Sequence, residues 1–265
     1  MSDSSAKPVA APIPAATILL IRDGTNGLEV FMIKRHHQIE FATGALVFPG
    51  GKVQRSDFDA ELGAHMDGVA AWSAEMHALA AAAIREAFEE AGVLLARDGA
   101  TGAFIDETRL SRLESYRRPL EKGEISLREF VVKENLRLAC DHLVHFAHWI
   151  TPKMMPKRFD THFFIALAPR GHAGRHDGGE SVASVWISPD EAIADRKRWN
   201  IMFPTKLNLM KLARSKTVDA ALAAARAAPP VTVEPWVEEG VDGAILRIRE
   251  DAGYGQTWAP MREAM

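Results

Sequence analysis

The chain has 265 residues, a hydrophobic content of 47% and a formal net charge of −3, which excludes a strongly basic nucleic-acid binder and leaves ample material for a buried core. Its single cysteine, Cys140, rules out an intramolecular disulfide framework, and we expect it to pack as a small apolar side chain. No apolar run approaches the ~20 residues that span a bilayer, and no segment has a secretory pattern. The default expectation is a cytoplasmic protein that binds neither nucleic acid nor membrane.

The first part of the chain predicts a tail followed by strands. Residues 1–14 are rich in Ala, Pro and Ser and predict a disordered tail. Residues 15–22 and 28–35 predict two strands, joined by turn-forming residues that favour a hairpin. A third predicted strand, residues 46–48, runs into a Pro-Gly-Gly turn at 49–51. The backbone of such a turn has no side chain in the way of a ligand or ion.

Beyond the acidic segment at residues 84–95, helical and strand patterns alternate. Residues 107–141 predict two or three helical pieces, interrupted at Pro119 and Gly123. The remaining patterns predict strands at 142–151, 161–168 and 180–187, a short helix from Ser188, a long helix at 204–228, and an extension at 229–265 with a strand at 244–249. Strands interspersed with helices indicate a mixed α/β layered domain at residues 15–228.

Three glutamates share one face of a predicted helix, because Glu86, Glu89 and Glu90 occupy positions i, i+3 and i+4. Like charges one turn apart destabilise a helix by roughly 0.2–0.5 kcal/mol. Their convergence without a lysine therefore predicts a cation between them, and a hard divalent ion is the natural candidate. Arg85 lies four residues before Glu89, where it can brace that carboxylate. The alternative is an amphipathic helix whose acidic face is only solvated.

Two segments together carry a family resemblance. The segment Phe48-Pro49-Gly50-Gly51-Lys52 precedes the acidic segment Arg85-Glu86-Ala87-Phe88-Glu89-Glu90-Ala91-Gly92-Val93. Together they resemble the Nudix box of the Nudix hydrolases, which is written G-x5-E-x7-R-E-U-x-E-E-x-G-U with U apolar. The second half matches at every specified position. The first half differs, because residues 53–72 interrupt it and His77 stands where the first glutamate is expected.

A box that is split by an insertion is similar to the subgroup of Nudix proteins that includes the peroxisomal acyl-CoA and coenzyme A diphosphatases. Three further segments fit this subgroup, at residues 148–152, 158–164 and 185–192. The resemblance implies an α/β fold, namely the α/β/α sandwich of the Nudix proteins with a mixed sheet. It further implies a helical insertion at 107–141 and a C-terminal extension of helix and strand.

The resemblance also implies roles for the acidic segment. The implied metal ligands are Glu86, Glu89, Glu90 and the backbone of Gly50 or Gly51, and the implied ion is Mg²⁺ or Mn²⁺. The general base is either one of these carboxylates, with Glu89 and Glu86 as catalytic candidates, or a loop carboxylate. Glu180 is the loop candidate, although an exposed glutamate at the end of a strand explains it equally well. Arg85 is expected to orient a carboxylate.

The residues expected to contact substrate surround the Pro-Gly-Gly turn. The implied substrate-binding residues are Arg35, Phe48, Gly50 and Arg158. For Arg158 an internal salt bridge at the start of a strand is an equal alternative. The coenzyme A signature is met only in part, because Glu40 occupies a site where an arginine suited to phosphate is expected.

The function implied is Mg²⁺-dependent hydrolysis of the diphosphate bond in a nucleoside diphosphate derivative, with coenzyme A or acyl-CoA as the leading substrate. The alternatives are another specificity of the NADH, ADP-ribose or nucleotide-sugar type, and a non-catalytic protein that senses a nucleotide. A small-molecule substrate is thus the expected partner, and a homodimer is left open. From its position, the 53–72 insertion is expected to form a lid or a flap beside the substrate.

Several histidines invite a second metal hypothesis. His142, His145 and His148 fall at i, i+3 and i+6, which fits neither one face of a strand nor a helical ligand pair. We therefore favour ordinary histidines, partly buried or at the surface, over a zinc site. His36 and His37 complete the set of neighbouring histidines.

Overall fold

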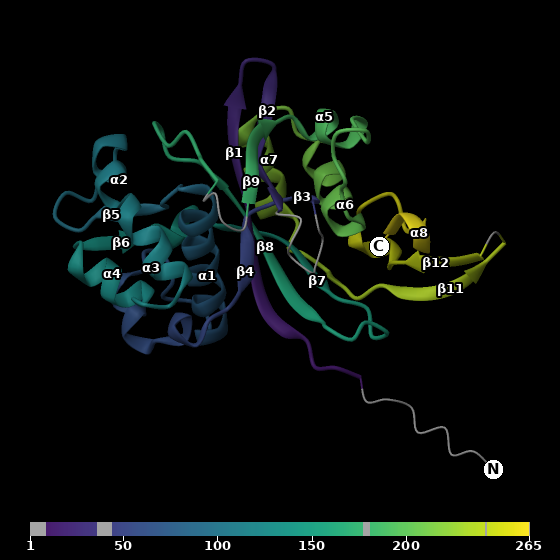
Figure 1. The fold of residues 1–265 in the computed structure, drawn as a ribbon, viewed down its shortest axis with the longest axis horizontal. Coiled ribbons are helices and arrows are strands. Elements are labelled where there is room, and N and C mark those ends of the chain that lie inside the picture. Colours follow the sequence, from purple (N-terminus) through teal and green to yellow (C-terminus); the bar gives the residue numbers. More distant parts are fainter. Residues whose placement is uncertain (1–8, 36–43, 177–180, 242, 265) are drawn as a thin grey trace, which may run out of the picture.

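The computed structural model describes residues 9–35, 44–176, 181–241 and 243–264, and a mixed β-sheet forms its centre (Figure 1). The strands of this sheet are β1 Ile13–Gly24, β2 Gly27–Arg35, β3 Leu46–Val47, β4 Gly50–Lys52, β7 Val144–Ile150, β8 Phe159–Leu167, β9 Ser181–Ile187 and β10 Thr232–Val233. They run in the order β10-β7-β8-β1-β2-β3, with β4 paired to β1 and β9 paired to β2. β1 runs parallel to β8 and antiparallel to β2 and β4. The strands that the sequence predicted up to residue 187 are present, and β1 begins at Ile13, inside the predicted tail.

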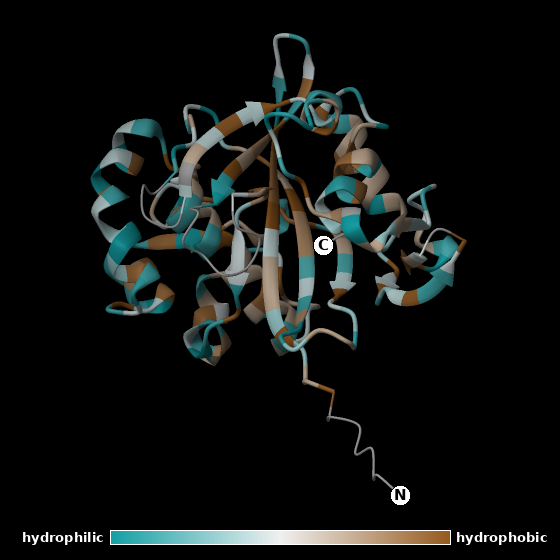
Figure 2. Ribbon diagram, turned by 45° about the vertical axis from the view of Figure 1, so that its right-hand side comes forward, coloured by the Kyte–Doolittle hydropathy of each residue, from teal (hydrophilic) through white to brown (hydrophobic). Residues whose placement is uncertain are grey.

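The sheet separates two hydrophobic cores, because its central strands are buried on both faces. Ile18 and Leu20 of β1 pack into one core, whereas Leu19 and Ile21 pack into the other. This alternation follows the two-residue period of a strand. Figure 2 shows hydrophobic residues running along the central strands and many hydrophilic positions on the surrounding helices and the hairpin ends. A sheet between two helical layers is the sandwich that the resemblance implied.

One layer contains the acidic helix and the predicted helical insertion. Its elements are η1 Arg55–Phe58, η2 Ala60–His65, α1 Ala74–Ala91, β5 Ala96–Asp98, α2 Glu107–Leu113, η3 Glu114–Tyr116, α3 Arg117–Glu121, α4 Leu127–Lys133, β6 Leu136–Leu138 and η4 Cys140–His142. The prediction of helical pieces at 107–141 is confirmed as far as Lys133. It is wrong for β6, which pairs with β5. Cys140 is buried in this core, as expected.

The helix α1 starts and ends at clear local signals. Ser73 caps its N-terminus by accepting a hydrogen bond from the backbone N–H of Met76. Gly92 ends it in the left-handed conformation at φ 63°, and its N–H donates to the carbonyl of Phe88. Every residue from Ala78 to Ala91 is buried, including the three glutamates. The acidic face is therefore not a solvated surface.

The insertion at 53–72 forms two short 3-10 helices, η1 and η2, that belong to the first helical layer (Figure 1). Asp57 of η1 is buried, and Leu62 of η2 belongs to the first core. These buried side chains anchor the two short helices to the first layer. The hypothesis of a lid or flap beside the substrate stays a prediction.

The second helical layer consists of α5 Pro189–Ala194, α6 Phe203–Leu212 and α7 Val218–Ala227. The predicted single helix at 204–228 is wrong, because the chain leaves α6 after Leu212 and starts α7 anew. Thr217 caps α7 by accepting from the N–H of Ala220, and the Asp23 carboxylate accepts from the N–H of Val218. The first backbone N–H groups of a helix have no partner within the helix, and these two side chains accept from them. In a continuous helix the same N–H groups would bond to the preceding turn.

The C-terminal extension packs against the second layer. It contains β10 and a three-stranded sheet of β11 Trp236–Gly240, β12 Gly243–Arg247 and β13 Trp258–Pro260, with η5 Glu250–Ala252 and α8 Met261–Ala264. Leu246, Ile248 and Tyr254 are buried in the second core. The extension therefore shares the core of the domain.

Within the part of the chain that the structure describes, no helix is both long and apolar enough to cross a membrane.

Candidate active site

Arg85 forms the centre of the acidic helix, with a side chain only 1% exposed. Its Nε and Nη2 donate to the two oxygens of Asp57 at 3.1 and 3.0 Å. Its Nη1 donates to Glu86 at 2.7 Å and to Glu89 at 3.0 Å, and Nη2 also donates to the backbone carbonyl of Lys52 at 2.9 Å. All five N–H donors of the guanidinium are thus engaged. The contact expected between Arg85 and Glu89 is present.

The three glutamates of the box have different partners. Glu86 accepts from Arg85, whereas Oε2 of Glu90 accepts from the backbone N–H of Gly50 at 2.8 Å. Glu89 is 5% exposed, and its Oε1 is buried with no hydrogen-bond partner among the described residues. A buried carboxylate oxygen without a donor is costly, so it marks a place where a cation or a proton belongs.

Burial is the main cause of an altered protonation equilibrium at Glu89. It raises the pKa of Glu89 to about 8, while Arg85 acts in the opposite direction and the neighbouring Glu86 and Asp57 reinforce the rise. Burial by itself lowers the pKa of Arg85, but Glu86, Asp57 and Glu89 more than offset it and raise that pKa. Arg85 therefore stays charged, and the acidic cluster favours an added positive charge.

The two glycines of the Pro-Gly-Gly turn are required by close approach. Gly50 and Gly51 lie in β4, opposite Thr17 and Ala16 of β1. A Cβ on Gly50 would lie 2.6 Å from the carbonyl oxygen of Ala16, and one on Gly51 would lie 2.5 Å from Oε1 of Glu86. The turn thus brings bare backbone against the carboxylates, as the motif predicted.

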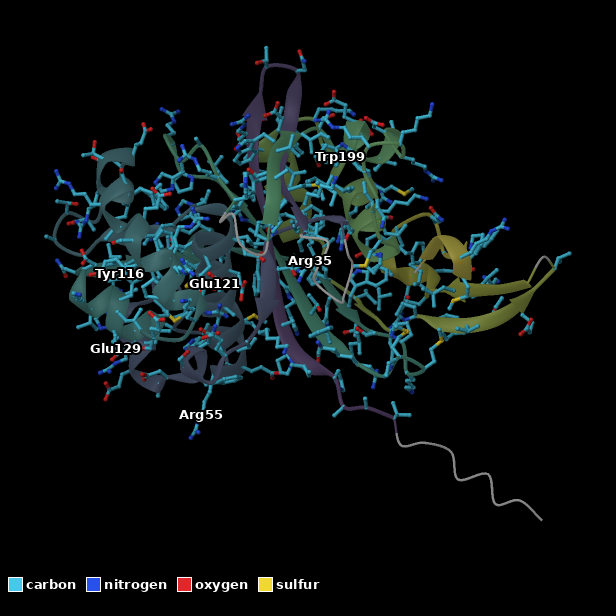
Figure 3. All side chains as sticks on the ribbon, viewed as in Figure 1. Arg35, Arg55, Tyr116, Glu121, Glu129 and Trp199 are labelled. Atoms are coloured by element: carbon cyan, nitrogen blue, oxygen red, sulfur yellow. The ribbon has the colours of Figure 1, made fainter. Side chains whose placement is uncertain are left out.

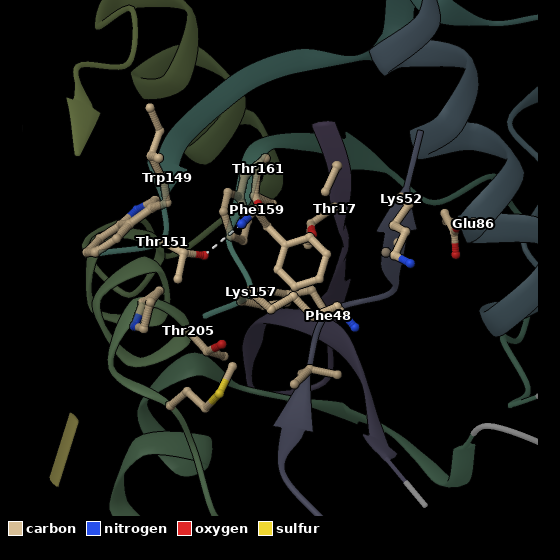
Figure 4. A pocket seen from close by; sticks show the side chains of 18 of the residues that line it. Thr17, Phe48, Lys52, Glu86, Trp149, Thr151, Lys157, Phe159, Thr161 and Thr205 are labelled. Carbon is tan, nitrogen blue, oxygen red and sulfur yellow. Dashed lines mark hydrogen bonds between the residues drawn. The ribbon is translucent and has the colours of Figure 1, made fainter. Parts of the chain in front are cut away.

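A cleft of about 960 Å³ opens beside these carboxylates. Its lining includes the predicted residues Arg35, Phe48, Gly50, Gly51, Glu86, Glu89 and Glu90. Figure 4 shows Glu86 and Lys52 at one side of the cleft and Trp149 and Thr205 at the other, with Phe48 between them. The site is therefore elongated, with an acidic end and a more apolar end.

Three cationic side chains, Arg35, Lys52 and Lys157, line the cleft. Arg35 lies near the centre of the molecule (Figure 3), and its Nε is buried with no hydrogen-bond partner among the described residues. The ammonium of Lys157 stands 5.6 Å from the ring centre of Phe159. Cations beside buried carboxylates can offset the negative charge of a phosphate ligand.

One predicted residue, Arg158, does not line this cleft. Arg158 is 6% exposed, and its nitrogens donate to the carbonyls of Thr151 and Ala10 and to the carboxylate of Glu234. It is absent from the described lining of the cleft, and its contact with Glu234 favours the alternative of an internal salt bridge. Glu180 and Glu40 lie outside the described residues.

Several lining residues were missed from the sequence. Pro235 and Leu246 of the C-terminal extension contribute to the wall, as do Trp149, Thr205 and Lys157. They come from segments far apart in the chain, and no local pattern marks them. Lys52 could have been predicted from the sequence, because it directly follows the Pro-Gly-Gly turn.

The histidines form a network on the other face of the sheet. His148, Asp160 and His162 are the only group of three described His, Cys, Asp or Glu side chains whose ligand atoms all lie within 4.8 Å of one another. The carboxylate oxygens of Glu86, Glu89 and Glu90 therefore do not all lie within 4.8 Å of one another. However, His148 already bonds Thr232 at 2.8 Å and Asp160 at 2.5 Å. The rings of His148 and His162 are stacked, with their centres 3.9 Å apart. The preference for ordinary histidines over a zinc site therefore stays a prediction.

Comparisons with known proteins agree with the box. The family model described as the NUDT19 Nudix domain matches residues 70–212. Acyl-coenzyme A diphosphatase NUDT19 of Xenopus laevis is 25% identical over 222 residues, which are 69% of this chain and 58% of that protein. The match therefore spans less than two thirds of that relative. A crystal structure of a NUDIX hydrolase from Alicyclobacillus acidocaldarius superposes with a TM-score of 0.73 at 29% identity, covering 83% of this chain and 99% of that one. The chain belongs to the Nudix hydrolase family, with a Nudix domain of the NUDT19 type.

Proposed function

We propose that this protein is a Mg²⁺- or Mn²⁺-dependent diphosphatase that hydrolyses a nucleoside diphosphate derivative, with coenzyme A or acyl-CoA as the leading substrate. One observation carries the proposal. Glu86, Glu89 and Glu90 are all buried, and all three line one end of the same cleft. Burying three carboxylates on one helix is costly, and a single arginine, Arg85, bonds only two of them, Glu86 and Glu89, so the arrangement supports a site for an added cation.

The residues present fit a divalent cation. The unpartnered Oε1 of Glu89 is an oxygen ligand that no described donor satisfies. The carboxylates of Glu86 and Glu90 and the bare backbone at Gly51 complete an oxygen-only set, which suits Mg²⁺ or Mn²⁺. Their wide spacing fits an ion that keeps waters and takes substrate oxygens as further ligands. Such an ion would supply neutralisation of the diphosphate charge and orientation of the attacking water.

The side chains around the carboxylates have separate tasks in the proposed reaction. Arg35 and Lys52 contact the phosphate groups and offset their charge. Arg85 holds Glu86 and Glu89 in place and does not reach the substrate, because all its donors are used. The proton of the attacking water would be taken up by a box carboxylate, Glu86 or Glu89, through an oxygen that does not hold the ion, or by the loop candidate Glu180.

The elongated cleft supports a substrate that extends well beyond its diphosphate. Trp149, Phe159 and Leu246 offer apolar surface away from the carboxylates. An aromatic wall can stack on a base or cover an alkyl chain. The Xenopus relative is named an acyl-coenzyme A diphosphatase, which makes coenzyme A and its thioesters the leading candidates.

A substrate panel tests the proposal. Purified protein with Mg²⁺ is incubated with coenzyme A, acyl-CoA, NADH, ADP-ribose and a nucleotide sugar, and the products are separated by chromatography. We expect 4′-phosphopantetheine and adenosine 3′,5′-bisphosphate from coenzyme A. Turnover of another substrate alone would refute the coenzyme A assignment. Turnover of none, with ligand affinity intact in Glu89→Gln, would favour a nucleotide sensor.

A further inference from the structure

The insertion within the box supplies a buried carboxylate to the active site. Asp57 lies in η1, and its side chain is fully buried. Both of its oxygens accept from Arg85, a bidentate arrangement that fixes distance and orientation together. The backbone N–H of Gln54 donates to Oδ2 of Asp57 at 2.8 Å. The carboxylate is thus anchored to the insertion on one side and to the guanidinium on the other.

The orientation of Arg85 determines where two glutamates lie. A guanidinium is planar, and its five donors have fixed directions relative to one another. Asp57 occupies the edge formed by Nε and Nη2, so the remaining nitrogen, Nη1, points at Glu86 and Glu89. Without Asp57, only the backbone carbonyl of Lys52 would hold this side of the guanidinium, and the direction of Nη1 toward Glu86 and Glu89 would be less strictly fixed.

Charge sharing gives Asp57 a second effect. A single guanidinium faces the three carboxylates of Asp57, Glu86 and Glu89. Because Asp57 takes up part of the positive charge, Glu86 and Glu89 keep more of their attraction for an added cation. Without Asp57, the arginine would compete more strongly with that cation for the same two carboxylates.

The helix α1 has no carboxylate at the position where the Nudix box has its first glutamate. His77 stands there, and its Nε2 bonds the carbonyl of Val69 at 2.9 Å. We propose that Asp57, brought in by the insertion, is a positioning residue that holds Arg85 and through it the metal-binding carboxylates. The inference rests on the proposed function, because it assumes that Glu86 and Glu89 bind the catalytic ion.

The test measures metal binding without turnover. Mn²⁺ is titrated into the full-length chain and free Mn²⁺ is followed by electron paramagnetic resonance. The variants are Asp57→Asn and, as a matched control, Asp59→Asn, which changes the same residue type in the same insertion. The Asp59 carboxylate accepts from the backbone N–H of Glu61 and pairs with Arg128, not with Arg85. We expect the Mn²⁺ dissociation constant to rise about 10- to 100-fold in Asp57→Asn, as for other residues that orient ligands, and to stay unchanged in Asp59→Asn.

Folding is checked by circular dichroism, and each titration is made below the unfolding midpoint of its variant. If Asp57→Asn does not fold, Asp57→Glu replaces it, because it keeps the charge and displaces the carboxylate by one methylene; a smaller rise is then expected. An unchanged Mn²⁺ affinity in the folded variant overturns the proposal, and so does an equal loss in Asp59→Asn.

The two proposals fail in different ways. A wild-type chain that binds Mn²⁺ but cleaves no diphosphate of the panel refutes the proposed function, while the comparison of variants still decides the role of Asp57. A wild-type chain that binds no Mn²⁺ overturns both. In an active enzyme, we also expect Asp57→Asn to lower kcat and raise the Mg²⁺ concentration for half-maximal rate, with little change in the KM for substrate.

Discussion

Replacing Gly51 by alanine tests whether the turn and the acidic helix form one site. The added Cβ would lie 2.5 Å from Oε1 of Glu86 and 2.7 Å from its Cδ, whereas ordinary contact begins at 3.4 Å. The carboxylate must therefore retreat by about 1 Å, and a displacement of that size at a reacting centre can cost about 100-fold in rate. The same oxygen accepts the 2.7 Å bond from Arg85, which we expect to weaken.

The loss of stability should leave the protein folded, although in free energy it is of the same order as the loss of activity, because a 100-fold lower rate corresponds to about 2.7 kcal/mol. A hydrogen bond to a charged group contributes about 1.5–3 kcal/mol, which sets the scale of the cost. For a protein of this size that corresponds to a fall in Tm of about 3–12 °C. The variant should remain folded at 25 °C and yet lose most of its Mg²⁺-dependent hydrolysis.

The assay compares kcat, the Mg²⁺ concentration for half-maximal rate, and thermal unfolding in wild type, Gly51→Ala and Gly63→Ala. Gly63 is the matched control, because the atom nearest to its added Cβ, Nδ1 of His77, lies 3.7 Å away. We expect Gly63→Ala to behave as wild type. Wild-type activity in Gly51→Ala would show that the position of Glu86 does not matter for the reaction, and the argument from close approach would be wrong.

Three further predictions concern the helix and the sheet. Glu89→Gln and Glu90→Gln should each lower kcat by orders of magnitude while circular dichroism stays unchanged; a wild-type rate in both would disprove the metal assignment. Arg117→Met should cost about 1–3 kcal/mol in urea denaturation, because Nε and Nη2 of the buried Arg117 both donate to the backbone carbonyl of Glu89. Burial, reinforced by neighbouring histidines, lowers the pKa of His145 and His162 to about 4. The unfolded chain then binds more protons, so the free energy of unfolding should fall as the pH drops from about 6.5 to 4. His145→Phe should reduce that fall, and an identical pH profile in denaturation experiments would contradict the assignment.

Local patterns in the sequence were sufficient for the acidic helix and its neighbours. The spacing of Glu86, Glu89 and Glu90 placed them on one face, and the bare backbone of Gly50 and Gly51 was expected to approach a ligand. The contact between Arg85 and Glu89 also followed, because residues four apart are neighbours on a helix. These features depend on a few adjacent residues, so periodicity and turn chemistry determine them.

Only the tertiary structure decided which distant residues complete the site. Asp57 reaches Arg85 from an insertion without a recognisable pattern, and Arg158 bonds Glu234 and is absent from the described lining of the cleft. Leu246 of the C-terminal extension enters the cleft wall because it packs in the same core as Trp149. Such contacts depend on how layers and loops pack in three dimensions. The sequence by itself therefore determined the acidic helix and the box, and the packing of the insertion and the extension determined how that box is held and what surrounds it.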